Sequence, residues 1–328
     1  MTFGYYENIN KIDQVLGTDC PPNYPCVAGV YLSNLWYGHQ QILVEYLGLD
    51  PKLVPLLGKV QHGWQPLTGI DYEQGMRVEI AAGRDPFWVW NRRNIELAKA
   101  EGFNWGRAIG APFLYKYPDS KWPKWSSPIE STLLALPTHS ISTLRVEGWE
   151  LYANWLADFA KVEGFTKVEA SLHFMDYIDE SLHRIFTDLG IEISTIGGYF
   201  QKNYLDKVVD RFNRVTAVVS DRVCSGGFYA LLGGKPFAVC GPMLAATKQE
   251  DFDHDDLGPA GDQDWIQKNI PALAGGKFCD KMRVAYDELG AEYVEDKRKL
   301  FEDLFYPAIR RWKLIPDRAL PFDSEKQG

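Results

Sequence analysis

One stretch in the second half of the chain, residues 217–243, constrains the fold more than any other. It contains the apolar run AVVS, the turn DRVCSGG, the apolar run FYALL, the pair GG and the run KPFAVC. This order is typical of a strand, a glycine turn, a helix, a second turn and a second strand. The strand runs are short and apolar, as in strands buried on both faces. We therefore expect the helix N-terminus at the carboxyl edge of a parallel sheet.

The turn before this helix carries the candidate phosphate-binding residues Ser225, Gly226 and Gly227, with Cys224 beside them. Free backbone N–H groups and the helix dipole favour an anion at a helix N-terminus. Glycine lets that anion approach the backbone closely. The simpler alternative is a tight turn between a strand and a helix, because short glycine-rich loops are common in such connections.

Strands and helices alternate twice along the chain, which is typical of α/β proteins. Residues 115–128 interrupt the alternation with Pro, Trp, Ser and Lys and are interpreted as a linker. We expect two Rossmann-like domains, 1–128 and 129–328, that face each other across a cleft, with C-terminal helices able to cross back onto the first domain. The expected strands cover 53–60, 87–90, 107–109, 132–137, 167–174, 191–196, 217–220 and 237–240. The expected helices cover 28–47, 91–101, 147–162, 180–188, 201–213 and 228–232, with further ones from 281 and 295.

Composition limits the classes of partner and compartment. The formal net charge of -9 argues against nucleic acid as the main partner, since phosphate backbones are bound by clustered Lys and Arg. No apolar run reaches the length of a membrane span and the N-terminus lacks a signal-peptide pattern, so we expect a cytoplasmic protein. Cys20 and Cys26 could form a disulfide loop or half of a metal site, and two free thiols are the favoured interpretation. The acidic run 251–256 is interpreted as a solvated loop rather than a metal site.

Four signals occur where predicted strands end, two in each half of the chain. They read QHGWQP at 61–66, GAP at 110–112, LPTHS at 136–140 and SDRVCS at 220–225 followed by KP at 235–236. Ligands of open α/β sheets bind at the carboxyl ends of the strands. These four segments therefore hold the candidate site residues.

In this order the signals resemble those of GT-B fold glycosyltransferases of bacterial surface-polymer synthesis. The pattern is most similar to the group of CDP-glycerol glycerophosphotransferases and capsule or O-antigen transferases, over about residues 57–243. That group has His-Gly-Thr-Pro, Gly-x-Pro, Pro-Thr and Ser/Thr-Asp-Tyr-Ser-Ser followed by Lys-Pro. Here Trp64 and Gln65 stand in place of the Thr, Gly226 and Gly227 follow the Ser, and the first half is short. These departures make a nucleotide sugar at least as strong a candidate for the donor as CDP-glycerol.

The resemblance implies roles for individual residues. His62 corresponds to the general base that takes the proton of the acceptor hydroxyl, a role that suits an imidazole near neutral pH. The alternative for His62 is a histidine that hydrogen-bonds the sheet edge. His139 and Ser140 would donate to the donor phosphates and stabilise charge on the leaving group. Asp221 is a further candidate at the phosphate site, with a structural alternative in which it caps the turn or pairs with Arg222.

Four more positions are candidates for the acceptor side or the cleft: Gly63, Trp64, Gly110 and Pro112. His39, His173 and His183 are interpreted as structural. The resemblance implies no metal, because GT-B enzymes generally need none and the sequence lacks an acidic pair at a strand end. It implies no cofactor other than the nucleotide-activated donor.

The resulting hypothesis is a transferase that moves a sugar or polyol phosphate to a hydroxyl of a growing surface glycan or lipid-linked acceptor. Peripheral association with a membrane would suit such an acceptor. Two alternatives stay open. One is a nucleotide-sugar epimerase of the same fold, which turns over without an acceptor, and the other is a non-catalytic module that binds a glycan or nucleotide.

Overall fold

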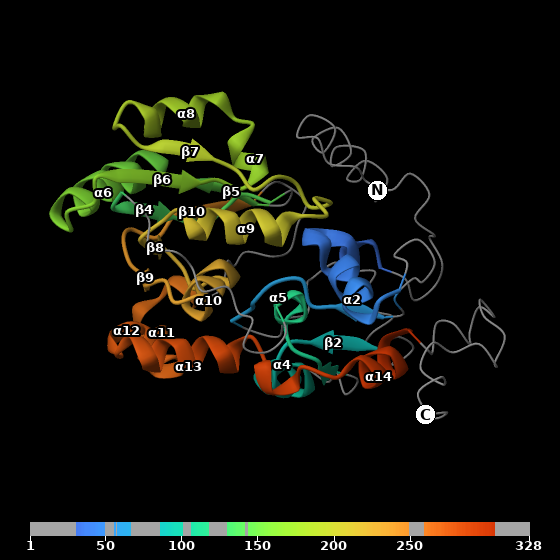
Figure 1. Cartoon of the computed structure of the whole chain (residues 1–328). Coiled ribbons are helices and arrows are strands. Elements are labelled where there is room, and N and C mark those ends of the chain that lie inside the picture. Colours follow the sequence, from blue (N-terminus) through green and yellow to red (C-terminus); the bar gives the residue numbers. More distant parts are fainter. Residues whose placement is uncertain are drawn as a thin grey trace. The chain divides into compact units, whose positions relative to one another are not determined.

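The computed structural model describes residues 31–49, 56, 58–66, 86–100, 106–117, 130–141, 144–248 and 259–305 (Figure 1). These residues form two compact units. The larger unit contains 63–66 and the described residues between 130 and 288, and the smaller unit contains the described residues of 31–62, 86–117 and 289–305. Cys20, Cys26, the acidic run 251–256 and nearly all of the predicted linker lie outside the described residues.

The larger unit is built on a five-stranded, fully parallel sheet with the order β7-β6-β4-β8-β9. The chain enters at the central strand, runs outward through the next two strands, and returns to the other side of the centre. This is the doubly wound arrangement of dinucleotide-binding folds. The strands are β4 (Thr132–Ala135), β6 (Lys167–Ser171), β7 (Glu192–Ser194), β8 (Ala217–Ser220) and β9 (Phe237–Val239).

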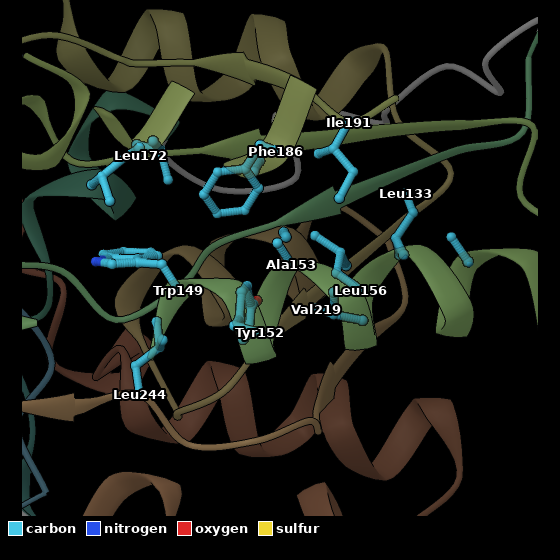
Figure 2. Packing of buried hydrophobic residues seen from close by; sticks show 14 of the residues in the cluster. Leu133, Trp149, Tyr152, Ala153, Leu156, Leu172, Phe186, Ile191, Val219 and Leu244 are labelled. Carbon is cyan, nitrogen blue, oxygen red and sulfur yellow. The ribbon is translucent and has the colours of Figure 1, made fainter. Parts of the chain in front are cut away.

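One face of this sheet is covered by α6 (Trp149–Val162) and α8 (Glu180–Thr187). The buried residues of α6 recur at helical spacing, so one apolar stripe faces the strands. Figure 2 shows Trp149, Tyr152 and Leu156 of this stripe against Phe186 of α8 and the sheet. Burial of each large apolar side chain contributes about 1.5–3 kcal/mol, so this layer stabilises the unit substantially.

The opposite face carries a largely buried polar network beneath α9 (Tyr204–Asn213), in which the Arg211 and Glu169 side chains are 12% and 15% exposed. Arg211 of this helix forms an ion pair of 2.8 Å with Glu169 of β6 and hydrogen-bonds Ser194 of β7. Glu169 also accepts from the Ser194 hydroxyl at 2.6 Å. A buried charge needs such partners, because desolvation without them costs several kcal/mol. The network therefore ties α9 to two neighbouring strands.

The remaining elements of the larger unit lie around this sheet (Figure 1). β5 (Leu144–Glu147) and β10 (Ala245–Lys248) form a separate antiparallel pair. The helix α10 (Ser225–Leu232) connects β8 to β9. The other helical segments are α7 (Phe174–Tyr177), η3 (Pro259–Gly261), α11 (Gln263–Asn269), α12 (Pro271–Gly275) and α13 (Phe278–Glu288).

The smaller unit contains a second parallel sheet with the order β1-β2-β3. Its strands are β1 (Lys59–Val60), β2 (Phe87–Val89) and β3 (Gly106–Ala108). The helical segments of its first part are η1 (Leu32–Gly38), α2 (His39–Leu47), α4 (Arg92–Ala100) and α5 (Pro112–Lys116). Gln61 fixes the end of β1 to β2, since its side-chain oxygen accepts from the Trp90 N–H at 3.1 Å and its carbonyl accepts from the Trp90 indole at 2.9 Å.

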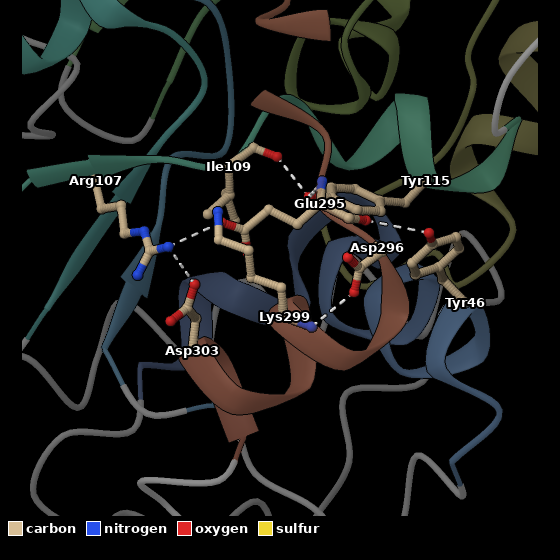
Figure 3. Close-up of polar contacts among 8 residues, drawn as sticks. All are labelled: Tyr46, Arg107, Ile109, Tyr115, Glu295, Asp296, Lys299 and Asp303. Atoms are coloured by element: carbon tan, nitrogen blue, oxygen red, sulfur yellow. Dashed lines mark hydrogen bonds and ion pairs between the residues drawn. The ribbon is translucent and has the colours of Figure 1, made fainter. Parts of the chain in front are cut away.

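Residues 289–305 complete the smaller unit as η4 (Ala291–Tyr293), α14 (Lys297–Leu300) and η5 (Phe301–Phe305). Figure 3 shows how Glu295 joins this segment to the earlier elements. Its carboxylate accepts from Arg107 of β3 at 3.1 Å and from Lys299 at 2.8 Å. Its backbone N–H donates to the Tyr115 hydroxyl and its carbonyl accepts from Tyr46, both at 3.1 Å. The last described segment is thus bonded to β3, α5 and α2.

The predicted α/β class with a parallel sheet in each half is confirmed by these two sheets. Two predicted elements were wrong in detail. The continuous helix over 28–47 is divided at Tyr37, whose backbone is left-handed, into η1 and α2. The strand over 167–174 stops at Ser171, and Phe174 already begins α7, for which His173 is the N-cap. The division at residue 128 and the cleft stay predictions.

Candidate functional site

The carboxyl edge of the larger sheet has its topological switch point between β4 and β8, where the strand order reverses. Ligands of doubly wound folds bind at this point, because the connections from the two central strands leave in opposite directions and open a crevice. The segment 136–140 follows β4 and the segment 221–225 follows β8. Two of the four predicted strand-end signals therefore meet at this edge.

Asp221 holds these two strand ends together. Its carboxylate accepts from the backbone N–H and the hydroxyl of Thr138, both at 2.7 Å, and from the Leu244 N–H at 3.2 Å. The Arg222 Nε lies 3.7 Å from the Asp221 carboxylate, and the Arg222 guanidinium donates to the Leu244 carbonyl at 3.2 Å. Asp221 is 1% exposed, and a carboxylate repels phosphate. These contacts favour the structural alternative for Asp221.

Ser140 is likewise held by a carboxylate, that of Asp176 in α7, which follows the neighbouring strand β6. Its backbone N–H donates to Asp176 at 2.8 Å, and its hydroxyl accepts from the Val146 N–H at 3.0 Å. The Asp176 carboxyl is buried, and this burial raises its pKa, while hydrogen bonds from the Ser140 hydroxyl and N–H act in the opposite direction. Ser140 thus fixes the shape of the segment after β4, and its hydroxyl is already used.

His139 has a second ring nitrogen, Nε2, for which the described residues supply no hydrogen bond. Its Nδ1 lies 3.0 Å from the Ser140 carbonyl, which can only accept, so Nδ1 carries the hydrogen. The ring is half-buried and stacks on His173, with centroids 4.1 Å apart and an angle of 19°. Burial, and next the charge of His139, hold the pKa of His173 well below its ordinary value. At neutral pH His173 is therefore an uncharged platform for the His139 ring.

The N-terminus of α10 is arranged differently from the sequence prediction. Burial raises the pKa of the Cys224 thiol to about 11, against hydrogen bonds that include the N–H groups of Gly227 and Gly226. A Cβ on Gly226 would lie 2.7 Å from Leu136, and one on Gly227 would lie 2.3 Å from the Phe237 ring. Both glycines therefore allow close packing of the helix on the sheet, and the Gly227 N–H donates to the Cys224 carbonyl at 3.1 Å.

Ser225, the first residue of α10, receives the segment 63–66. Its hydroxyl oxygen accepts from the Trp64 N–H at 2.8 Å. The Trp64 indole donates to Glu288 at 2.6 Å, and its ring contacts Phe228 and Trp265. Trp64 is 6% exposed, so it anchors the segment and offers no open face for a sugar. A Cβ on Gly63 would lie 3.7 Å from the Ser225 hydroxyl, which is ordinary contact.

Lys235, from the Lys-Pro pair of the resemblance, is also structural here. Its Nζ donates to the Val215 carbonyl at 2.6 Å, and the residue is 5% exposed. The bond ties the loop before β9 to the loop before β8, far from the carboxyl edge of the sheet.

His62 follows β1 in the smaller unit, at the carboxyl edge of that sheet, and is half-buried. Its ring contacts Trp36 with centroids 5.0 Å apart in a T-shaped geometry, and Tyr37 with centroids 6.2 Å apart. His39, the first residue of α2, lies close to both Tyr37 and His62. The predicted base is thus surrounded by aromatic rings from the start of η1–α2.

Gly110 and Pro112 end β3 in the same unit, and both are buried. Gly110 has φ 77°, and a Cβ there would lie 2.9 Å from the Gly290 carbonyl. The N–H of Ala111 donates to the Leu289 carbonyl at 2.8 Å. The Gly-x-Pro signal therefore builds a tight turn that lets residues 289–290 approach the end of β3.

The structure brings His139, Ser140, Asp221 and the start of α10 to one sheet edge, and their roles there stay predictions. His173 follows β6 as His139 follows β4, and its ring stacks on His139, which agrees with the structural role expected for it. Tyr37 and Trp36 carried no comparable signal.

Within the described ranges, no group of three His, Cys, Asp or Glu residues could hold a metal ion. Cys224, Cys240 and Cys279 are free thiols. Across the same ranges, every helix is too short or too polar to span a bilayer.

No protein-family model matches the chain, and no curated protein matches it in sequence. Among solved structures, the chain is similar to a UDP-GlcNAc 2-epimerase from Neisseria meningitidis, with 13% identity and a TM-score of 0.40 over 71% of this chain and 64% of that one. It is also similar to two structures of TarM, one of them from S. aureus in complex with fondaparinux, α-GlcNAc-glycerol and UDP. These have 12% identity, TM-scores of 0.35 and 0.32, and cover 76% and 84% of this chain. The chain spans 48% and 53% of the TarM chains.

Proposed function

We propose that the chain is a glycosyltransferase that moves a sugar from a nucleotide-activated donor to a hydroxyl of a surface glycan. The donor phosphates are assigned to the carboxyl edge of β4 and β8 in the larger unit. The acceptor hydroxyl is assigned to His62 in the smaller unit. A polyol phosphate in place of the sugar, and a lipid-linked acceptor, are finer forms of the same proposal.

The observation that carries the proposal is the place of His139 at the switch point. Its single hydrogen bond among the described residues fixes Nδ1, so the ring can present only Nε2 to a ligand. Once protonated, Nε2 donates to a phosphate oxygen while Nδ1 keeps its bond to the Ser140 carbonyl. The uncharged His173 beneath supports that ring.

The chemistry needs one proton acceptor and one stabiliser of the leaving group. The acceptor oxygen forms a bond to the anomeric carbon of the donor, and the bond from that carbon to the phosphate oxygen breaks. The electron pair of the broken bond stays on the nucleotide, where His139 offsets the new charge. His62 takes the proton of the acceptor hydroxyl. The start of α10 adds the positive end of its dipole to the donor side.

Calorimetry with CMP, CDP, UDP, GDP and dTDP tests the donor site and identifies the nucleobase of the donor. We expect one of these nucleotides to bind, and His139→Gln to weaken its binding about 10- to 150-fold, since a hydrogen bond to a charged group contributes about 1.5–3 kcal/mol. His183→Gln is the matched control, because the His183 ring of α8 hydrogen-bonds the Tyr177 carbonyl of α7 at 2.7 Å. Failure of every nucleotide to bind contradicts the proposal.

Turnover with the nucleotide sugar that binds then tests the reaction. His62→Ala is expected to slow transfer by about a hundredfold to ten-thousandfold, the usual contribution of general-base catalysis. Donor affinity should change little. Conversion of the donor to a second sugar without any acceptor would identify an epimerase. Binding without turnover would identify a non-catalytic module.

A further inference from the structure

Tyr37 has an unusual backbone for its residue type. Among the residues that the structure describes, it is the one non-glycine residue with a positive φ, 56°, and its ψ is 18°. This left-handed region costs a residue with a Cβ about 1–2 kcal/mol. Gly38 follows with φ 73° and adopts that region without the cost. A bulky side chain held in this conformation indicates strain that the surrounding contacts sustain.

The strain has a geometric result at His62. Side chains of consecutive residues diverge in a regular helix or strand. Here the Trp36 ring meets the His62 ring edge-on, with centroids 5.0 Å apart and an angle of 76°. The Tyr37 ring lies 6.2 Å from the same imidazole at 36°, within the usual range of aromatic contacts. The left-handed residue therefore lets two neighbouring aromatic residues contact one histidine.

His39 adds an uncharged neighbour to this group. Its ring centroid lies 5.9 Å from that of Tyr37, and the residue is 1% exposed. Burial, and next the charge of His62, lower the pKa of His39 to about 3. Its Nδ1 has no hydrogen-bond partner within the described part of the chain. His39 thus fills space against Tyr37 and brings no charge beside His62 near neutral pH.

We propose that Tyr37 is a positioning residue, whose ring, together with that of Trp36, fixes the orientation in which the His62 imidazole takes a proton from the acceptor. This inference rests on the proposed role of His62 as the base. The left-handed backbone of Tyr37 places its ring beside His62. The conformational cost of this backbone lowers the free energy of unfolding, and in return the imidazole is held in one orientation.

Three variants separate the ring of Tyr37 from its backbone. Tyr37→Gly removes the ring and the strain, Tyr37→Asn removes the ring but tolerates the left-handed region, and Tyr37→Phe keeps the ring. We expect the Gly and Asn variants to lose about 10- to 100-fold in turnover, as for a misplaced catalytic group, with donor KM unchanged. Tyr37→Phe should retain turnover. NMR of histidine-labelled protein should show a changed tautomer population for His62 in the Gly and Asn variants alone.

Combination with His62→Ala completes the test. In that background Tyr37→Gly should cause no further loss of turnover, because it acts through the imidazole. A full additional loss would overturn the inference, and so would Gly and Asn variants with wild-type turnover and unchanged His62 signals. If His62→Ala itself spares turnover, the base proposal fails, and the NMR signals still decide whether Tyr37 holds the ring.

Discussion

Thr138 and Asp221 are joined by two hydrogen bonds of 2.7 Å, one from the backbone N–H of Thr138 and one from its hydroxyl. They follow β4 and β8, the two strands that flank the switch point. A carboxylate that accepts two such bonds fixes both the position and the direction of the segment that leads to His139. The edge of the sheet is therefore shaped before any ligand arrives.

Replacement of Asp221 should affect stability first. Asp221→Ala leaves the N–H groups of Thr138 and Leu244 without an acceptor, and we expect a loss of about 2–4 kcal/mol in the free energy of unfolding. Asp221→Asn keeps one acceptor oxygen and should lose less. Urea unfolding measures both, with the exposed Asp188→Asn as the control. Unchanged stability with weakened nucleotide binding would instead support a direct phosphate role for Asp221.

The two glycines of α10 should respond differently to an added methyl group. Gly227→Ala places its Cβ against the rigid Phe237 ring, and we expect a net loss of about 1–3 kcal/mol from overpacking. Gly226→Ala meets the flexible end of Leu136 and should lose less. Gly275→Ala at the end of α12 has open space around it and serves as the control. Equal stability of all three variants would contradict the packing role.

Stability should fall as the pH decreases from about 6.5 towards about 3. The unfolded chain protonates His39 and His173 near their ordinary pKa of about 6.5, whereas the folded chain binds these protons only at lower pH. The unfolded state therefore carries more protons in this window, so stability rises with pH there. Each histidine contributes a slope of up to about 1.4 kcal/mol per pH unit. Between pH 6 and 5, His39→Phe should reduce the slope by about the contribution of one histidine, up to about 1.4 kcal/mol per pH unit. An unaltered slope in urea unfolding would exclude His39 as a cause.

The ion pairs of Arg107, drawn in Figure 3, should contribute more to stability than a fully exposed pair. Arg107→Met leaves the nearly buried carboxylate of Glu295 with Lys299 alone and also releases Asp303. Because the Arg107 side chain is itself 42% exposed, we expect a loss of about 1–3 kcal/mol, below the range for fully buried pairs. Arg298→Met breaks the exposed pair with Glu302 and should cost about 0–0.5 kcal/mol. Thermal unfolding of the two variants gives the comparison, and equal losses would refute it.

Much of the fold follows from sequence patterns because its causes are local. The α6 stripe, the valine run of β8 and the glycines at the start of α10 each act within a few residues, and each element was predicted. The roles within the site depend on partners distant in sequence. Trp64 suggested a cleft residue, yet its contacts with Ser225 and Glu288 bury it.

The left-handed backbone of Tyr37 is a second feature that local sequence patterns did not predict. Propensity disfavours this conformation for tyrosine, and the ring contacts of Tyr37 with His62 and His39 help to sustain it. The predicted helix over 28–47 therefore passed through the one place where the chain turns away from helical geometry. Local rules fail here because tertiary contacts determine the backbone.

The hydrogen bonds of Glu295 to Arg107, Tyr46 and Tyr115 also bear on when the smaller unit can complete its folding during translation, because Glu295 is synthesised long after its three partners. All five strands of the larger sheet lie between residues 132 and 239, so that sheet can form while later residues are still inside the ribosome. The three-stranded sheet is translated first, yet the segment that covers its end emerges only after residue 289. The smaller unit should thus be the last to gain protection from proteolysis on the nascent chain.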